Sequence, residues 1–314
     1  MSNPFRILVT GDMHLSSKNY GSHINYPGES LEMFQFVTEC LANNDCGMLI
    51  GLGDFTYGRF HDLDYRLAIE EELTKQNELT NGNRYELKGN HDKLTSGTSE
   101  WEFYVKKGLL KNVPYIDTPC ARLHLVNFGE EFNELAIDHS KKNIVFGHNY
   151  FKYKSTLLPN YGEAIILDDF KTWQYVDLII TGHIHDIITC KGYIIGDGPN
   201  QKEIPVLYLG CPNRPSYKKQ DLDTQGKFLI LDCSGEQISI QELLFDLPPI
   251  EDVFLLGDIP DSKNEPLVDV SDIVRDLVAH ERVMNDPEQI IDILTDFTPE
   301  AKQRAKELYR EALS

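Results

Sequence analysis

The 314-residue sequence has few cysteines and no long apolar run. Its six cysteines form no CxxC pair and fall outside every motif discussed below, which excludes the usual thiolate metal site and gives no disulfide framework. Neither a membrane-spanning stretch of roughly 18 apolar residues nor an N-terminal signal-peptide pattern is visible. These absences predict reduced thiols, no membrane partner and a cytoplasmic location.

Positive charge is also scarce, because 30 basic residues stand against 50 acidic ones and give a net charge of −20. Non-specific affinity for nucleic acid comes mainly from basic side chains on phosphates, so tight and unaided DNA binding is not expected. Two basic strips interrupt this pattern, one with aromatic residues at 150–154 and one at 214–219. Such strips suit a nucleic-acid backbone with stacked bases, although solvated loops are the alternative. The candidate substrate contacts are Lys152, Lys154 and Arg214.

Five short signatures rich in glycine, aspartate and histidine recur along the chain, each after a short apolar run. In order they are Gly11-Asp12-Met13-His14, Gly53-Asp54, Gly89-Asn90-His91-Asp92, Gly147-His148 and Gly182-His183-Ile184-His185. The runs before them are predicted to be short buried strands. They cover residues 7–9, 48–50, 85–87, 144–146 and 178–180.

Helical spacing of apolar residues separates most of these strands. The pattern predicts helices over residues 29–43, 64–79 and 163–174. Strands that alternate with helices form parallel sheets through right-handed crossovers, and the fold class is therefore α/β. Ligands in such sheets gather at the carboxyl ends of the strands. We therefore expect the five signatures to meet at one rim.

Seven residues in the signatures can bind metal, which is about the number that a two-metal site needs. Carboxylate, imidazole and amide groups without thiolate suit manganese, iron or zinc. Two ions about 3.5–4 Å apart clamp the attacking and leaving oxygens of a displacement at phosphorus. Asp54 is the natural candidate to bridge them. The candidate ligands are Asp12, His14, Asp54, Asn90, His148, His183 and His185.

His91 stands next to a candidate ligand and has the chemistry of a general acid. Histidine titrates near neutral pH and can protonate a leaving oxygen that lies within reach. The alternative is that His91 only caps a turn.

Taken in order, the five signatures resemble those of the calcineurin-like metallophosphoesterases, over roughly residues 5–235. The resemblance implies two central sheets flanked by helices, an α/β/β/α sandwich. It implies that Asp12, His14 and His185 hold one ion, that a second group of three holds the other, and that Asp54 holds both. The second group is Asn90, His148 and His183. His91 would then protonate the leaving oxygen, with Asp92 or a neighbour orienting it.

Details of the signatures resemble the phosphodiesterase branch, and within it the SbcD-type DNA nucleases. The second signature lacks the Asp-Arg-Gly continuation of the protein phosphatases, and the third ends in Asp92 where they carry glutamate. The stretch Asp12-Met13-His14-Leu15 resembles the Asp-x-His-Leu of the nucleases, and 206–232 resembles their Gly-x-Pro loop and following strand. Tyr57 departs from the pattern, since such nucleases often carry histidine or aspartate there.

That resemblance implies a manganese-dependent exo- or endonuclease, a homodimer that is the catalytic subunit of an SbcCD-type repair or recombination complex with an SbcC-type ATPase. One alternative is a phosphodiesterase or phosphatase that acts on nucleotides or other small molecules. Another is a non-enzymatic scaffold whose active site has lost its activity. The organisation expected is a nuclease domain over 1–246, a linker over 247–268 and a helical tail over 269–314. The tail resembles the helices that clasp the ATPase, although packing on the body is the alternative.

Overall fold

The computed structural model describes residues 5–16, 28–57, 60, 62–94, 97–129, 135–152, 164–167, 171–185, 188–195, 202–214, 225–249 and 303. The chain divides into two compact units, Met1–Leu255 and Leu256–Ser314. Except for residues 247–249 and 303, the expected linker and helical tail lie outside the described residues. Among the described helices, none has the length and apolar character that a membrane crossing requires.

The first sheet of the larger unit holds the strands that precede the first three signatures. Its described strands are ordered β13-β12-β1-β2-β3. Strands β1, β2 and β3 run parallel, whereas β12 is antiparallel to both β1 and β13. The bounds are β1 Arg6–Thr10, β2 Cys46–Gly51, β3 Arg84–Glu86, β12 Gly226–Asp232 and β13 Ser239–Phe245.

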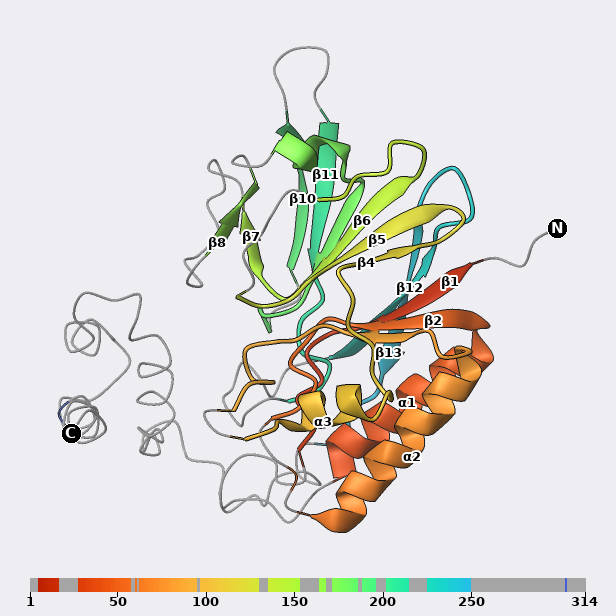
Figure 1. The fold of residues 1–314 in the computed structure, drawn as a ribbon, viewed down its shortest axis with the longest axis vertical. Coiled ribbons are helices and arrows are strands. Elements are labelled where there is room, and N and C mark those ends of the chain that lie inside the picture. The colour runs from red at the N-terminus through yellow and green to blue at the C-terminus, as the bar shows by residue number, and fades with distance from the viewer. Residues whose placement is uncertain are drawn as a thin grey trace. The chain divides into compact units, whose positions relative to one another are not determined.

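The second sheet holds the strands that precede the last two signatures. Its described strands are ordered β10-β11-β9-β6-β5-β4 (Figure 1). Strands β5, β6, β9 and β11 run parallel, with an antiparallel strand at each edge. The bounds are β4 Tyr115–Asp117, β5 Ala121–Val126, β6 Lys142–Gly147, β9 Leu178–Thr181, β10 Ile188–Ile195 and β11 Lys202–Tyr208.

Three described helices accompany the first sheet, and all three contribute side chains to the core on its outer face (Figure 1). They are α1 Gly28–Asn43, α2 Leu63–Leu79 and α3 Glu100–Lys106. Helix α2 begins after Asp62, whose side chain accepts hydrogen bonds from two backbone N–H groups of the first turn. The sequence-based predictions over 29–43 and 64–79 therefore agree with the structure to within a residue.

The alternation of side chains along β1 explains how the layers form. Leu8 points to the core shared with the helices, whereas Ile7 and Val9 point to the core between the two sheets. Strand β2 divides in the same way, with Leu49 on the helix side and Ile50 on the sheet side. The fold class predicted from sequence, two central sheets with flanking helices, is confirmed.

The helix predicted over 163–174 is wrong. In its place stand strand β8 (Ala164–Ile166), paired in parallel with β7 (Tyr150–Lys152), and the short 3₁₀-helix η3 (Lys171–Tyr175). Ile165 and Ile166 are β-branched, and pairing with β7 satisfies their backbone groups better than an isolated helical turn would. Trp173 of η3 is fully buried in a third core, on the face of the second sheet away from the first.

Candidate metal centre

Three candidate ligands meet where β1 and β9 end. The Nε2 atoms of His14 and His185 are 3.1 Å apart, and His185 Nε2 lies 3.8 Å from Oδ2 of Asp12. Asp12 and His14 are buried, while the side chain of His185 is 36% exposed. Two imidazole nitrogens that face each other beside a carboxylate form a suitable pocket for a cation.

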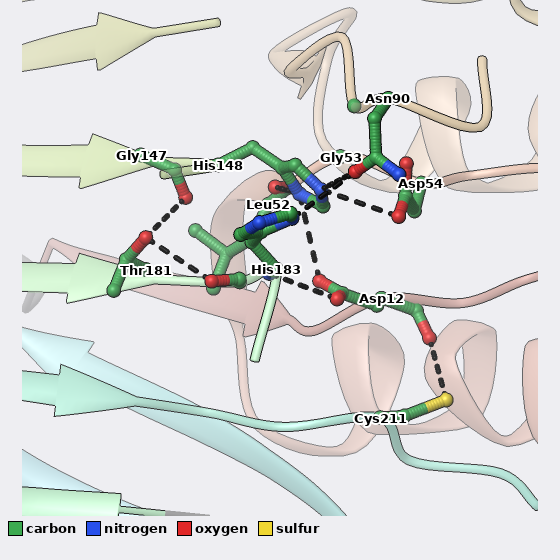
Figure 2. Close-up of polar contacts among 12 residues, drawn as sticks. Asp12, Leu52, Gly53, Asp54, Asn90, Gly147, His148, Thr181, His183 and Cys211 are labelled. Carbon is green, nitrogen blue, oxygen red and sulfur yellow. Dashed lines mark hydrogen bonds and ion pairs between the residues drawn. The ribbon is translucent and has the colours of Figure 1, made fainter. Parts of the chain in front are cut away.

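A second group meets where β3, β6 and β9 end. The side-chain oxygen of Asn90 lies 3.1 Å from His148 Nε2 and 3.1 Å from His183 Nδ1. Figure 2 shows these three side chains turned toward one another, with Asp54 beside them. The structure thus brings the residues of each implied ligand group together.

Asp54 lies between the two groups. Its Oδ2 atom is 3.2 Å from His148 Nε2 and 3.7 Å from His14 Nε2. Its other oxygen, Oδ1, accepts a hydrogen bond of 2.8 Å from the backbone N–H of His91. The hydrogen bond to Oδ1 therefore fixes the carboxylate so that Oδ2 faces both groups.

Three of the candidate ligands have a left-handed backbone, which is uncommon for residues other than glycine. The φ angles are 42° at His14, 47° at Asp54 and 76° at His183. Such conformations cost free energy and concentrate at functional sites. Close approach also requires the adjoining glycines, since a Cβ at Gly89 would overlap the Asp54 carboxylate and one at Gly182 would overlap that of Asp12.

Hydrogen bonds to backbone groups orient the ligands of the cluster. His148 Nδ1 donates to the carbonyl oxygen of Leu52 over 2.7 Å, which leaves Nε2 as the lone-pair nitrogen that faces Asn90 and Asp54 (Figure 2). The backbone N–H of His183 donates to Oδ2 of Asp12 over 2.9 Å. These bonds fix ring and carboxylate orientations as a metal site requires.

The electrostatics of the cluster also fit cations. Burial lowers the pKa of His14 far below its usual value and that of His183 to about 4, which keeps both rings in the neutral form that binds metal. Burial alone would lower the pKa of His148, but the carboxylates of Asp54 and Asp12 outweigh it and raise that pKa to about 10. These carboxylates therefore favour positive charge at the centre of the cluster.

One carboxylate oxygen of Asp12, Oδ1, is buried 3.6 Å from His148 Nδ1, beyond hydrogen-bonding distance. This oxygen has no hydrogen-bond partner among the described residues, and burial raises the pKa of the carboxyl well above its usual value. A buried acceptor without a partner is costly. A bound cation would satisfy it, so the residues present fit a divalent metal.

His91 and Asp92 occupy different surroundings. The half-buried ring of His91 lies 5.1 Å from that of His14 and 5.2 Å from that of Tyr57, between ring centroids, with a 31° tilt against Tyr57. Asp92 is fully buried and accepts hydrogen bonds from the backbone N–H groups of Phe55, Thr56 and Gly89. We expected Asp92 or a neighbour to orient His91. Among the described contacts, Tyr57 packs against the His91 ring and Asp92 binds the backbone of the neighbouring loops, and the orienting role stays a prediction.

Arg214 does not lie in a solvated strip. The residue is 7% exposed, and its guanidinium lies 3.1 Å from Oε2 of Glu29 in the first turn of α1. Its backbone N–H donates to the same carboxylate. This buried pairing differs from the expected substrate contact, since a guanidinium held this way has little surface left for phosphate.

The strip at 150–154 also differs from expectation. Tyr150 and Phe151 are buried in the third core rather than available for stacking, and the hydroxyl of Tyr208 donates to the backbone of Phe151. Lys152 ends strand β7, and Lys154 lies outside the described residues.

Two loops support the site: the Gly-x-Pro loop, noted in the sequence only as a resemblance, and the loop after β5, which sequence reasoning missed. After β11, the thiol of Cys211 donates to the backbone oxygen of Asp12 over 3.0 Å, and the Asn213 amide donates to that of Met13 over 2.8 Å. After β5, the ring of Phe128 lies 5.1 Å from that of His183. Both loops follow parallel strands of the same sheet, so the strand-end rule could have found them.

The chain is a calcineurin-like phosphoesterase: the model of that family matches residues 5–186, more than half of the chain. Members of this family are metal-dependent hydrolases of phosphate esters that use two divalent ions, and the cluster described above holds the residues for such a centre. No curated protein sequence matches the chain closely enough to count as a relative.

Solved structures similar to this chain include three at low identity. A dimetal phosphatase from Danio rerio aligns at 12% identity and a TM-score of 0.43, over 78% of this chain and 100% of that one. The protein TT1561 of Thermus thermophilus aligns at 12% identity and a TM-score of 0.40, over 76% of this chain and 99% of that one. The phosphoesterase YfcE of E. coli aligns at 17% identity and a TM-score of 0.36, over 77% of this chain and 100% of that one.

Proposed function

We propose that this phosphoesterase is a manganese-dependent DNA nuclease of the SbcD type that hydrolyses phosphodiesters with two metal ions. The observation that carries the proposal is the place of Asp54, whose Oδ2 faces the His14 group on one side and the His148 group on the other. Asp12, His14 and His185 would hold one ion, Asn90, His148 and His183 the other, and Asp54 both. Oxygen and nitrogen donors without thiolate suit manganese, with iron or zinc as alternatives.

The chain's own residues divide the remaining work. The metal pair, when bound, would polarise the phosphoryl oxygens and lower the pKa of the attacking water. His91, adjacent to Asn90 and near His14, donates a proton to the departing sugar oxygen. The ring of Tyr57 lies 5.2 Å from that of His91 and 5.9 Å from that of His14, and so packs beside both. Asp92 fixes the backbone that carries Asp54 and Asn90, because it bonds the N–H groups on both loops.

The second signature supports a diester over a monoester. Thr56 and Tyr57 follow Asp54 and Phe55 where the protein phosphatases continue toward Asp-Arg-Gly. Tyr57 brings an aromatic ring, not a cation, against His91. A diester carries one negative charge fewer than a monoester and needs less cationic support at this position.

Partners follow from the charge of the chain. A net charge of −20 opposes unaided binding to DNA. An SbcC-type ATPase that binds DNA and presents it would compensate, and we propose that the 269–314 segment binds such a subunit and that the nuclease is a homodimer. The same acidity favours one second candidate, a phosphodiesterase for nucleotides or other small molecules, which needs no extended basic surface.

Cleavage assays with manganese test the proposal. Linear and circular DNA, single- and double-stranded, are incubated beside bis-p-nitrophenyl phosphate, with EDTA as the metal-free control. Cleavage of DNA and of the small diester, both lost in EDTA, supports the nuclease. Cleavage of the small diester alone, unchanged when an SbcC-type subunit is added, supports the second candidate. Retained activity in EDTA would count against both.

A further inference from the structure

A half-buried aromatic ring stands beside the second group of candidate ligands. The ring of Phe128 lies 5.1 Å from that of His183, tilted by 40°, and 6.1 Å from that of His148, edge on. His91 and Tyr57 lie against His14 of the other group. The two candidate ion sites are therefore flanked by different side chains, His91 and Tyr57 at one and Phe128 at the other.

The backbone holds Phe128 firmly for a residue in a loop. Its N–H donates to the carbonyl oxygen of Lys88 over 2.9 Å. The preceding Asn127 accepts from the N–H of Lys88 over 2.8 Å, and its carbonyl oxygen accepts from the amide of Asn149, the residue after His148. The ring is thus placed by the same loops that place Asn90 and His148, and a ligand would meet it in a fixed position.

A cation covers this ring. Nζ of Lys93 lies 5.5 Å from the centroid of Phe128, and the lysine is exposed. An exposed cation–π contact stabilises less than the stacking of a nucleobase on an aromatic ring. An arriving base can therefore displace the ammonium group, whose flexible four-carbon stem keeps the positive charge near the site.

From this arrangement we infer that Phe128 is a stacking platform for the nucleobase on the side of the scissile phosphate that does not depart, which makes nucleotidyl diesters the substrate class. The inference rests on the proposed function, since the leaving oxygen must face His91. The group that stays on phosphorus then lies toward the His148–His183 side, where Phe128 stands. The role is one of binding and specificity, separate from the chemical step.

Two substrates with one leaving group isolate this contact. The p-nitrophenyl ester of thymidine 5′-monophosphate and ethyl p-nitrophenyl phosphate differ only in the group retained on phosphorus. The full-length manganese-loaded protein should show a KM about tenfold lower for the thymidine ester. Phe128→Leu, which keeps an apolar side chain but removes the ring, should remove most of that difference by raising KM for the thymidine ester more than for the ethyl ester. Phe128→Tyr should retain it.

The matched control is Tyr115→Leu. Tyr115 on β4 also lies under a cation, with Arg122 5.0 Å from its ring centroid, but it is 44% exposed on an edge strand that carries no signature. This variant should behave as the wild type does. Equal KM values for the two esters in the wild type would overturn the inference without any variant, as would an equal loss on both esters in Phe128→Leu.

A binding measurement separates failure of the inference from failure of the proposed function. If the wild type hydrolyses neither ester, the proposed function fails, and calorimetry with thymidine 5′-monophosphate and deoxyribose 5-phosphate still decides the role of Phe128. Tighter binding of the nucleotide, lost in Phe128→Leu, supports the platform. Equal binding of the two ligands rejects it.

Discussion

The carboxylate of Asp92 accepts a hydrogen bond from the backbone N–H of Thr56, over 3.1 Å to its Oδ1. Its Oδ2 accepts a second one, of 2.9 Å, from the backbone N–H of Gly89. One buried carboxylate thereby joins the loop of Asp54 to the loop of Asn90. Both loops supply candidate ligands, so the distance between them depends on this residue.

Asp92→Asn tests that role. The amide presents an NH₂ group to at least one backbone donor, and each buried donor left unpaired costs about 1–3 kcal/mol. We expect an unfolding free energy lower by on the order of 2 kcal/mol and weaker metal binding, measured by denaturant titration and by metal content after dialysis. A residue that only oriented His91 would instead lower kcat with full stability and metal content.

His91→Asn separates proton donation from metal binding. The ring is not one of the seven candidate ligands, so metal content should be unchanged. Loss of a general acid should lower kcat by about 10²–10⁴-fold for diesters with alkoxide leaving groups, and far less for p-nitrophenolate, which needs no proton. His139→Asn is the control, because His139 is exposed and lies before the amino-terminal end of β6, whereas the candidate site lies at the carboxyl end. A uniform loss over all leaving groups would contradict the assignment.

Ligand variants should remove the ions selectively. His185→Ala should leave one ion per chain by elemental analysis, since His185 belongs only to the group with Asp12 and His14. His183→Ala should spare the ion of that group instead. Asp54→Asn should weaken both, because its Oδ2 faces His14 and His148. Loss of a single ion in Asp54→Asn would show that the carboxylate does not bridge.

A buried glutamate predicts a pH dependence of stability. Burial raises the pKa of Glu86 to about 7, although Arg84, 3.1 Å away, partly offsets this. The folded state then binds the proton more tightly than the unfolded state, so this contribution is fully present below about pH 4.5 and is lost as the pH rises through 7.

Glu86→Gln removes that titration. The unfolding free energy of the wild type minus that of the variant should fall by on the order of 3 kcal/mol between pH 4.5 and 7, and should be flat above that range. Chemical denaturation in EDTA at a series of pH values measures it. A difference that rises with pH would mean that Arg84 keeps the carboxylate ionised.

The sequence predicted the parts of the fold that depend on local pattern and strand direction. Apolar runs before Asp12, Asp54 and His148 became strands because each buries its side chains on at least one face. Within each sheet the carboxyl ends of the parallel strands share a rim. The strands before Asp12 and Asp54 lie in one sheet and the strand before His148 in the other, so the packing of the two sheets is also needed to bring the signatures together.

Features that depend on tertiary packing could not be predicted in this way. The segment 163–174 has apolar spacing compatible with a helix, but its partner β7 lies outside the sequence window that sets such a pattern. Arg214 looks like a surface cation until Glu29, far away in sequence, is seen beside it. Phe128 belongs to no signature, and only the packing of its loop against Lys88 and Asn149 places it at the rim.

Each group of candidate ligands draws on both sheets. Asp12 and His14 extend from the first sheet and His185 from the second, and the other group pairs Asn90 of the first with His148 and His183 of the second. Bound ions would therefore cross-link the two sheets, in addition to the apolar core that already joins them. Loading with metal should raise the melting temperature. A chelator should weaken the interface between the two sheets before either sheet itself unfolds.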